Sequence, residues 1–169
     1  MDSPSFRYVT YIRTTAERLW AALTEPDFTA QYWAGHRVIS DFQPGSPIEM
    51  VGRGGDLMDS GRILVAEPPR RLVWEWRVEF DPRLTAMGFS RVSFELEPQG
   101  DVVRLTLVHD DFDPGSTLPD DYARGWPMVL SSLKSLLESG RGLEVFGEAA
   151  ADEAREEIRA RLDRNEGGT

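Results

Sequence analysis

The chain has 169 residues, a mass of 19.1 kDa, no cysteine and a formal net charge of −10. This length favours one compact domain, and the absence of cysteine excludes disulfides, thiolate catalysis and cysteine-ligated metals. The negative charge repels nucleic acid backbones and anionic lipids, so we expect neither as a partner.

Three further absences limit the class of protein to which the chain can belong. No apolar stretch approaches the roughly 20 residues of a membrane-spanning helix, so no span is expected. Residues 1–7 lack the basic and apolar regions of a secretory signal, which makes the cytoplasm the expected location. Lys134 is the one lysine and follows no glycine-rich loop, so lysine-based nucleotide binding is not expected.

The N-terminal third predicts a strand followed by two short helices. Residues 5–14 alternate in the manner of a strand, with Phe6, Tyr8, Thr10 and Ile12 on one face. Thr14 to Glu17 has the spacing of a capping box at the start of a helix that ends before Pro26. A second short helix is expected over 27–33.

Residues 37–110 read as short strands separated by turns rich in glycine and proline, which predicts an antiparallel meander. Three runs, 72–78, 92–96 and 103–109, show a clear period of two. Their apolar sets should face the core, and the parity of the last run places His109 on that buried face.

A long amphipathic helix is predicted over 120–139, with Asp120 or Asp121 as its cap and Gly140 at its end. Pro127 marks either the true start of this helix or a kink within it. In the tail, over 143–169, a weaker helical stripe could lie along the domain, pair with another subunit, or fray; its residues are Phe146, Ala150, Ala154, Ile158 and Leu162.

The order of elements predicts an α+β fold, a curved antiparallel sheet around a long C-terminal helix with two short N-terminal helices. Four segments carry a resemblance to a known family: TAERLWAALTEP at 15–26, PGSP at 44–47, EPPRRL at 67–72 and GWPMVLSSLK at 125–134. They resemble bacterial homologues of the activator of the 90-kilodalton heat-shock protein ATPase, in the START/Bet v 1-like (SRPBCC) superfamily. The resemblance implies a helix-grip domain over 1–142, followed by a charged, helical tail over 143–169.

Large apolar side chains on the inward faces suggest two alternatives, a solid core or a ligand cavity between sheet and long helix. The resemblance favours the cavity, because the superfamily includes lipid carriers, hormone receptors and cyclases. The candidate ligand-binding residues are Trp33, Met50, Trp74, Trp76, Phe94, Leu107, His109, Tyr122, Trp126, Leu130 and Leu133. Within this set, His109 and Tyr122 would orient a ligand, although His109 also suits a hydrogen-bonded core residue.

The remaining histidine, acidic and arginine side chains give weaker indications of a functional site. His36 is expected to be solvated, and two distant histidines match no metal motif, so neither a metal nor another cofactor is expected. Acidic pairs at 110–111 and 120–121 suit turns and caps better than acid–base catalysis. The arginines could clamp a ligand carboxylate or pair with surface acids; they are Arg53, Arg62, Arg70, Arg71 and Arg77.

The leading functional hypothesis is therefore a non-enzymatic domain that binds a small hydrophobic or aromatic molecule. The alternative is a protein-interaction or chaperone-regulatory module that contacts a partner, or a second copy, through its acidic surface or tail. Catalysis on a bound polyketide-like or aromatic compound, with His109 as the required group, is a third hypothesis.

Overall fold

A seven-stranded antiparallel sheet forms the base of the protein in a computed structural model, which describes residues 3–144 and 148–168. The spatial order of the strands is β1-β7-β6-β5-β4-β3-β2, so β2 to β7 form the predicted meander and β1 joins it beside β7. The strands are β1 (Phe6–Ile12), β2 (Arg37–Ser40), β3 (Pro47–Val51), β4 (Leu57–Glu67), β5 (Arg71–Val78), β6 (Ser90–Gln99) and β7 (Val102–Asp110).

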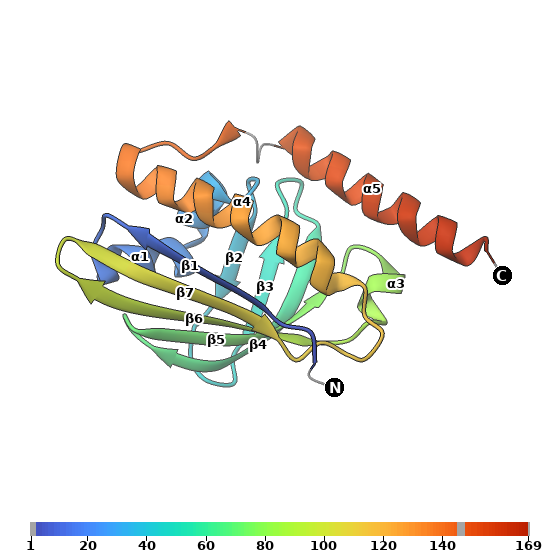
Figure 1. Cartoon of the computed structure of the whole chain (residues 1–169), viewed down its shortest axis with the longest axis horizontal. Helices are drawn as coiled ribbons and strands as arrows, with labels where there is room; N and C mark the ends of the chain where they lie inside the picture. The colour runs from blue at the N-terminus through green and yellow to red at the C-terminus, as the bar shows by residue number, and fades with distance from the viewer. Residues whose placement is uncertain (1–2, 145–147, 169) are drawn as a thin grey trace.

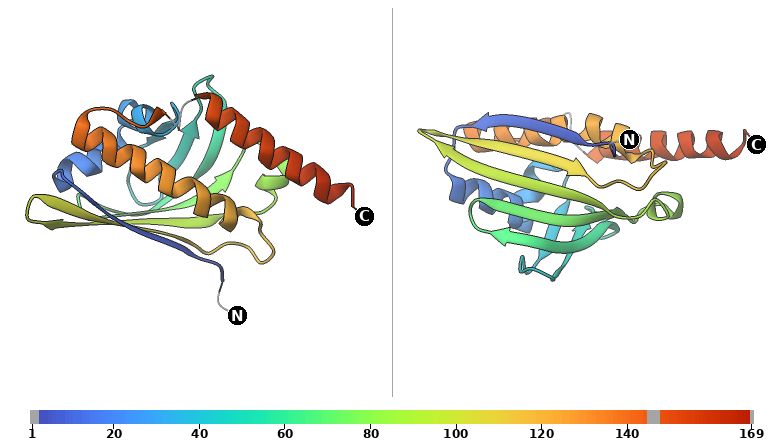
Figure 2. Two further views of the ribbon diagram at one scale, coloured as in Figure 1. Left: turned by 45° about the horizontal axis from the view of Figure 1, so that its top comes forward. Right: turned by 60° about the horizontal axis from the view of Figure 1, so that its bottom comes forward.

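Helices cover the concave face and close its ends. The long helix α4 (Leu118–Ser139) crosses the curved sheet, as Figure 1 shows, while α1 (Ala16–Thr24) and α2 (Pro26–Tyr32) connect β1 to β2. The oblique views show the sheet curving beneath α4 (Figure 2). This arrangement is the α+β fold that the order of elements predicts, a curved antiparallel sheet around a long helix, and it is the helix-grip fold that the resemblance implies.

The predicted inward faces of the strands are confirmed. The alternate residues from Leu72 to Val78 in β5 are at most 4% exposed, and Phe94 in β6 and Leu107 in β7 are completely buried. His109 is also completely buried, as its parity predicts. Leu72, Trp74, Trp76, Phe94 and Leu107 meet the apolar stripe of α4 in one continuous core, whereas Val78 belongs to a second cluster.

Two local expectations, on helix caps, were wrong, and one of the two alternatives for Pro127 is excluded. The cap of α1 is Thr15, whose hydroxyl accepts a hydrogen bond from the backbone N–H of Arg18, so the helix begins one residue later than the Thr14 capping box implies. Helix α4 begins at Leu118 with Thr117 at its N-cap position, which places Asp120 and Asp121 in the first turn. Pro127 lies inside this continuous helix and does not start it.

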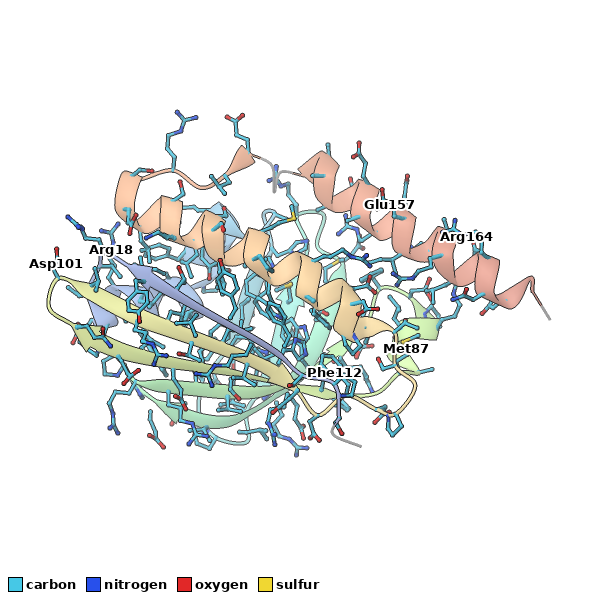
Figure 3. The ribbon with its side chains drawn as sticks, viewed as in Figure 1. Arg18, Met87, Asp101, Phe112, Glu157 and Arg164 are labelled. Carbon is cyan, nitrogen blue, oxygen red and sulfur yellow. The ribbon has the colours of Figure 1, made fainter. Side chains whose placement is uncertain are left out.

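A short helix, α3 (Pro82–Thr85), interrupts the meander between β5 and β6 where the sequence predicts no helix. Asp81 caps α3 by accepting a hydrogen bond from the backbone N–H of Arg83. Leu84 is completely buried and belongs to a second apolar cluster, with Phe112 and Leu118, near the start of α4. Figure 3 labels Met87 and Phe112 in this region.

Strand β4 is irregular at two points, and both shape the concave face. Its pairing with β3 shifts at Met58, and its pairing with β5 shifts near Leu64. Such bulges bend a strand and change the direction of its side chains. Between them, a Cβ on Gly61 would lie 1.7 Å from the backbone oxygen of Glu75, so only glycine allows β4 and β5 to approach so closely here.

The tail forms helix α5 (Glu148–Glu166), which lies along the domain rather than fraying. Leu162 is buried in the second cluster and Ile158 packs against it. Phe146, the first residue of the predicted stripe, lies outside the described residues. Within 3–144 and 148–168, no helix is both long and apolar enough to cross a bilayer.

Candidate functional site

A cavity of about 840 Å³ lies between the concave sheet, α4 and α5. The sheet contributes Met50, Met58, Asp59, Trp76 and Val78, and the end of α2 with the following loop contributes Trp33, Ala34 and His36. Helix α4 contributes Tyr122, Trp126 and Val129, among others. The alternative of a completely filled interior is therefore wrong for this end of the domain.

Helix α5 forms the roof of the cavity with Ala150, Ala154, Ile158 and Arg161. The guanidinium of Arg161 donates two hydrogen bonds to the carboxylate of Asp121, at 2.7 and 2.6 Å, which joins α5 to the first turn of α4. Figure 3 shows the side chains of α5 and labels Glu157 and Arg164 on it. The tail thus completes the site.

The structure brings five of the eleven predicted ligand-binding residues to the cavity wall: Trp33, Met50, Trp76, Tyr122 and Trp126. The other six belong to the surrounding core and do not line the cavity: Trp74, Phe94, Leu107, His109, Leu130 and Leu133. Their period-2 and helical patterns mark buried positions, but a pattern does not distinguish a wall from the packing behind it. Ligand contact by any of the eleven stays a prediction.

His109 lies in a hydrogen-bonded chain within the core. The indole N–H of Trp126 donates to its Nδ1 at 3.0 Å, so this nitrogen carries no proton and Nε2 donates to the hydroxyl of Ser90, 2.7 Å away. The Ser90 hydroxyl in turn donates to the backbone oxygen of Trp76. Burial lowers the pKa of His109 to about 3, so the imidazole is neutral at physiological pH.

His36 was expected to be solvated, but it is only partly exposed and lies at the cavity wall. Its Nδ1 is buried and has no hydrogen-bond partner within the described part of the chain. Burial lowers its pKa to about 4, and the positive charges of Arg155 and Arg53 add to this effect. The expectation failed because the loop after α2 folds inward beneath α5, a tertiary contact without a local sequence pattern.

Asp59 is one of the cavity residues that sequence reasoning missed, and it is the one with an ionisable group on the sheet side. It lies beside the bulge at Met58, where β4 departs from regular alternation, so its inward direction does not follow from a period of two. Burial raises the pKa of its carboxyl to about 8, and the nearby Glu79 carboxylate adds to the rise. Burial also raises the pKa of Tyr122, on the α4 side of the cavity, well above its usual value.

The candidate arginine clamp does not form on this wall. Arg62 pairs with Glu75, Arg70 with Glu67 and Arg77 with Glu79, as surface pairing predicts. Arg53 instead lines a smaller, more polar cavity of about 550 Å³ that shares His36 with the larger one. Within the described residues, no group of three histidine, aspartate or glutamate side chains is placed to hold a metal ion.

The comparisons with known proteins agree with this architecture. The family model described as activator of Hsp90 ATPase homolog 1-like protein matches residues 13–138, which is more than half of the chain. The chain belongs to this family. No curated protein matches this family member.

Solved structures of similar proteins share the helix-grip fold of this family member. The solution structure of CalU16 from Micromonospora echinospora has a TM-score of 0.67 and 26% identity, covering 85% of this chain and 71% of that one. The Aha1 dimer from Colwellia psychrerythraea has a TM-score of 0.66 and 20% identity, with coverage of 82% and 98%. Protein MLL2253 from Mesorhizobium loti has a TM-score of 0.67 and 23% identity, with coverage of 79% and 96%.

Proposed function

We propose that this protein binds a small hydrophobic or aromatic molecule in the cavity beneath α4 and α5, as a cytoplasmic binding domain rather than an enzyme. The observation that carries the proposal is a volume of about 840 Å³ next to a tightly packed core. Ligand sites are typically clefts or cavities of 300–1,000 Å³, and this volume lies within that range.

The cavity wall supports this chemistry. Three of the five tryptophans, Trp33, Trp76 and Trp126, line it together with Phe80 and Met50. Aromatic side chains offer large, flat contact surfaces, and methionine adapts to irregular shapes. Burial of apolar ligand surface would therefore supply most of the affinity.

The fold does not by itself select the activity, since one scaffold can host binding, regulation or catalysis. The catalytic hypothesis required His109 to contact the compound. Both of its ring nitrogens are already engaged, by Trp126 and Ser90, and it does not line the cavity. We therefore favour binding.

The test uses N-phenyl-1-naphthylamine, a neutral fluorophore whose emission rises in apolar surroundings. We expect saturable binding to the wild-type protein. Ala154→Phe should weaken this binding at least tenfold, because Ala154 lines the roof and a larger side chain would occupy the volume. Ala149→Phe, a change on the same helix that does not line the cavity, is the matched control. Binding that is absent, or unaffected by Ala154→Phe, would contradict the proposal.

Association with a second copy is a further candidate function, supported by the relative from Colwellia psychrerythraea that is described as a dimer. The tail is the part of the chain for which the sequence suggested pairing. Its apolar residues Ile158 and Leu162 already pack on their own domain, which reduces the surface left for a partner. Light scattering of the full chain and of a chain ending at Gly142 tests this candidate, which predicts a dimer only for the full chain.

A further inference from the structure

Asp59 lies on the wall of an apolar cavity, and its carboxyl group has no partner among the residues that the structure describes. Within residues 3–144 and 148–168 it makes neither an ion pair nor a hydrogen bond. The other inward-placed acids contrast with it, since each has a basic partner: Glu79 with Arg77, Asp81 with Arg83, and Asp121 with Arg161. An acid in this position is costly unless something neutralises or binds it.

The surroundings of Asp59 suit a cation. Trp76 and Tyr122 line the same cavity from the sheet and from α4, and Trp33 and Trp126 pack against each other at a ring-centroid distance of 5.2 Å. The faces of aromatic rings attract ammonium groups, most strongly where water is excluded.

The charges that face Asp59 do not supply that cation. On the sheet side, Glu79 adds a negative charge, although it is itself paired with Arg77. On the helical side, Arg161 is held by Asp121 and Arg155 by Asp152, while Glu157 adds a further acid at the rim. Arg124 and Arg164 also line the cavity, but neither pairs with Asp59 in the described part of the chain. His36 is neutral near pH 7, because burial and two arginines lower its pKa.

We propose that Asp59 anchors the ammonium group of a hydrophobic amine, whose apolar body lies against Trp33, Trp76 and Trp126. This inference rests on the proposed ligand-binding function and names the chemical class of the ligand. The ammonium donates hydrogen bonds to the Asp59 carboxylate and contacts the neighbouring rings, while the rest of the molecule fills the apolar volume.

The affinity of such a ligand depends on pH in a defined direction. Burial raises the pKa of Asp59 to about 8, so in the empty protein at pH 7 most copies of this carboxyl carry a proton. Binding an ammonium requires the carboxylate, so the proton leaves as the amine binds. The affinity for an amine should therefore rise from pH 6.5 to pH 8 by roughly tenfold.

The experiment compares three probes of the same shape by isothermal titration calorimetry: 1-naphthylmethylamine, 1-naphthylmethanol and 1-naphthoic acid. At pH 8 the wild-type protein should bind the amine at least tenfold more tightly than the alcohol, and the acid least tightly. Asp59→Asn should remove the preference for the amine. Asp101→Asn is the matched control, because Asp101 lies in the β6–β7 turn at the end of the molecule away from α5 (Figure 3).

A wild-type protein that binds amine and alcohol equally, or a preference that survives in Asp59→Asn, would overturn the inference and leave the proposed function intact. Failure of all three probes, and of the neutral fluorophore, would overturn both. If Asp59→Asn does not fold, the wild-type protein still decides the matter. Titrations of the amine at pH 6.5 in buffers of different ionisation enthalpy must then show proton release, and its absence would contradict the inference.

Discussion

The indole N–H of Trp126 donates to Nδ1 of His109 across 3.0 Å, which joins α4 to β7 inside the core. This contact decides the tautomer, because an indole can only donate. The proton of His109 is consequently on Nε2, and this N–H donates a hydrogen bond to the Ser90 hydroxyl. The histidine thus has a structural explanation that needs no ligand.

Ser90→Ala should destabilise the protein by about 1 to 3 kcal/mol, because it leaves the Nε2–H of His109 buried without an acceptor. Chemical denaturation monitored by tryptophan fluorescence measures the change. Ser93→Ala on the same strand is the control, since Ser93 is less deeply buried, and it should change stability by less than about 0.5 kcal/mol. Equal effects of the two changes would argue against the chain of hydrogen bonds.

Stability should be greatest near pH 6.5 and fall on both sides. Above pH 6.5, the raised pKa of Asp59 means that the folded protein holds a proton which the unfolded chain has lost, so stability falls as pH rises towards 8. Below pH 6.5, the lowered pKa values of His36 and His109 mean that the unfolded chain binds two protons that the folded protein does not.

The two histidines outweigh the opposing effect of Asp59, so stability falls by about 1.4 kcal/mol per pH unit as pH drops from 6.5 towards 4. Urea denaturation at pH 5, 6.5 and 8 checks this profile. Asp59→Asn should remove the decline between pH 6.5 and 8 while retaining the decline at lower pH. A decline above pH 6.5 that persists in this variant would show that another group causes it.

Arg161→Gln should loosen α5 while the rest of the domain stays folded, because it removes the two hydrogen bonds to Asp121. We expect faster amide hydrogen exchange over 148–166 and unchanged exchange in β5 to β7. Arg164→Gln on the same helix is the control, because the Arg164 side chain makes no ion pair comparable to that of Arg161 with Asp121 in the described structure. Unchanged exchange in Arg161→Gln would mean that the remaining contacts, among them the packing of Leu162 and the ion pair of Asp163 with Arg83, are enough to hold the helix.

Two glycines should respond to alanine in opposite directions. Gly61→Ala should destabilise the fold by more than about 2 kcal/mol, because the new Cβ would collide with the backbone of β5. Gly125→Ala should stabilise it by roughly 0.5 to 1 kcal/mol, because Gly125 lies within α4 with open space around it. Thermal unfolding of both variants tests the pair, and a tolerated Gly61→Ala would contradict the close approach of β4 and β5.

Sequence patterns predicted the buried faces correctly in elements whose apolar residues repeat with the period of a strand or a helix. In β5 to β7 and α4 the apolar period identifies the buried face, and it correctly places His109 inside. The order of elements was sufficient for a curved antiparallel sheet around a long helix, because a long amphipathic helix needs an apolar sheet face to cover. The helix-grip fold itself was implied by the family resemblance.

The residues that line the cavity could not all be predicted from local sequence periods. Trp74 and Trp76 share a strand face and a residue type, yet only Trp76 lines the cavity, since the difference depends on where α4 and α5 cross the sheet. Asp59 was not predicted to line the cavity because a bulge alters the direction of its side chain. His36 was not predicted there because its loop folds inward. Each of these depends on contacts between distant segments, which a local period does not contain.

The pairing of Phe6 with His109 has a consequence for how the chain acquires its structure. Strand β1 is made first during synthesis but finds its neighbour only after β7 has emerged from the ribosome. Pairing between such distant segments requires closure of a long loop, which slows folding. The hairpins from β2 to β7 can assemble beforehand, so docking of the N-terminal strand should be among the last steps of folding, and a nascent chain that ends before Val102 should leave it exposed.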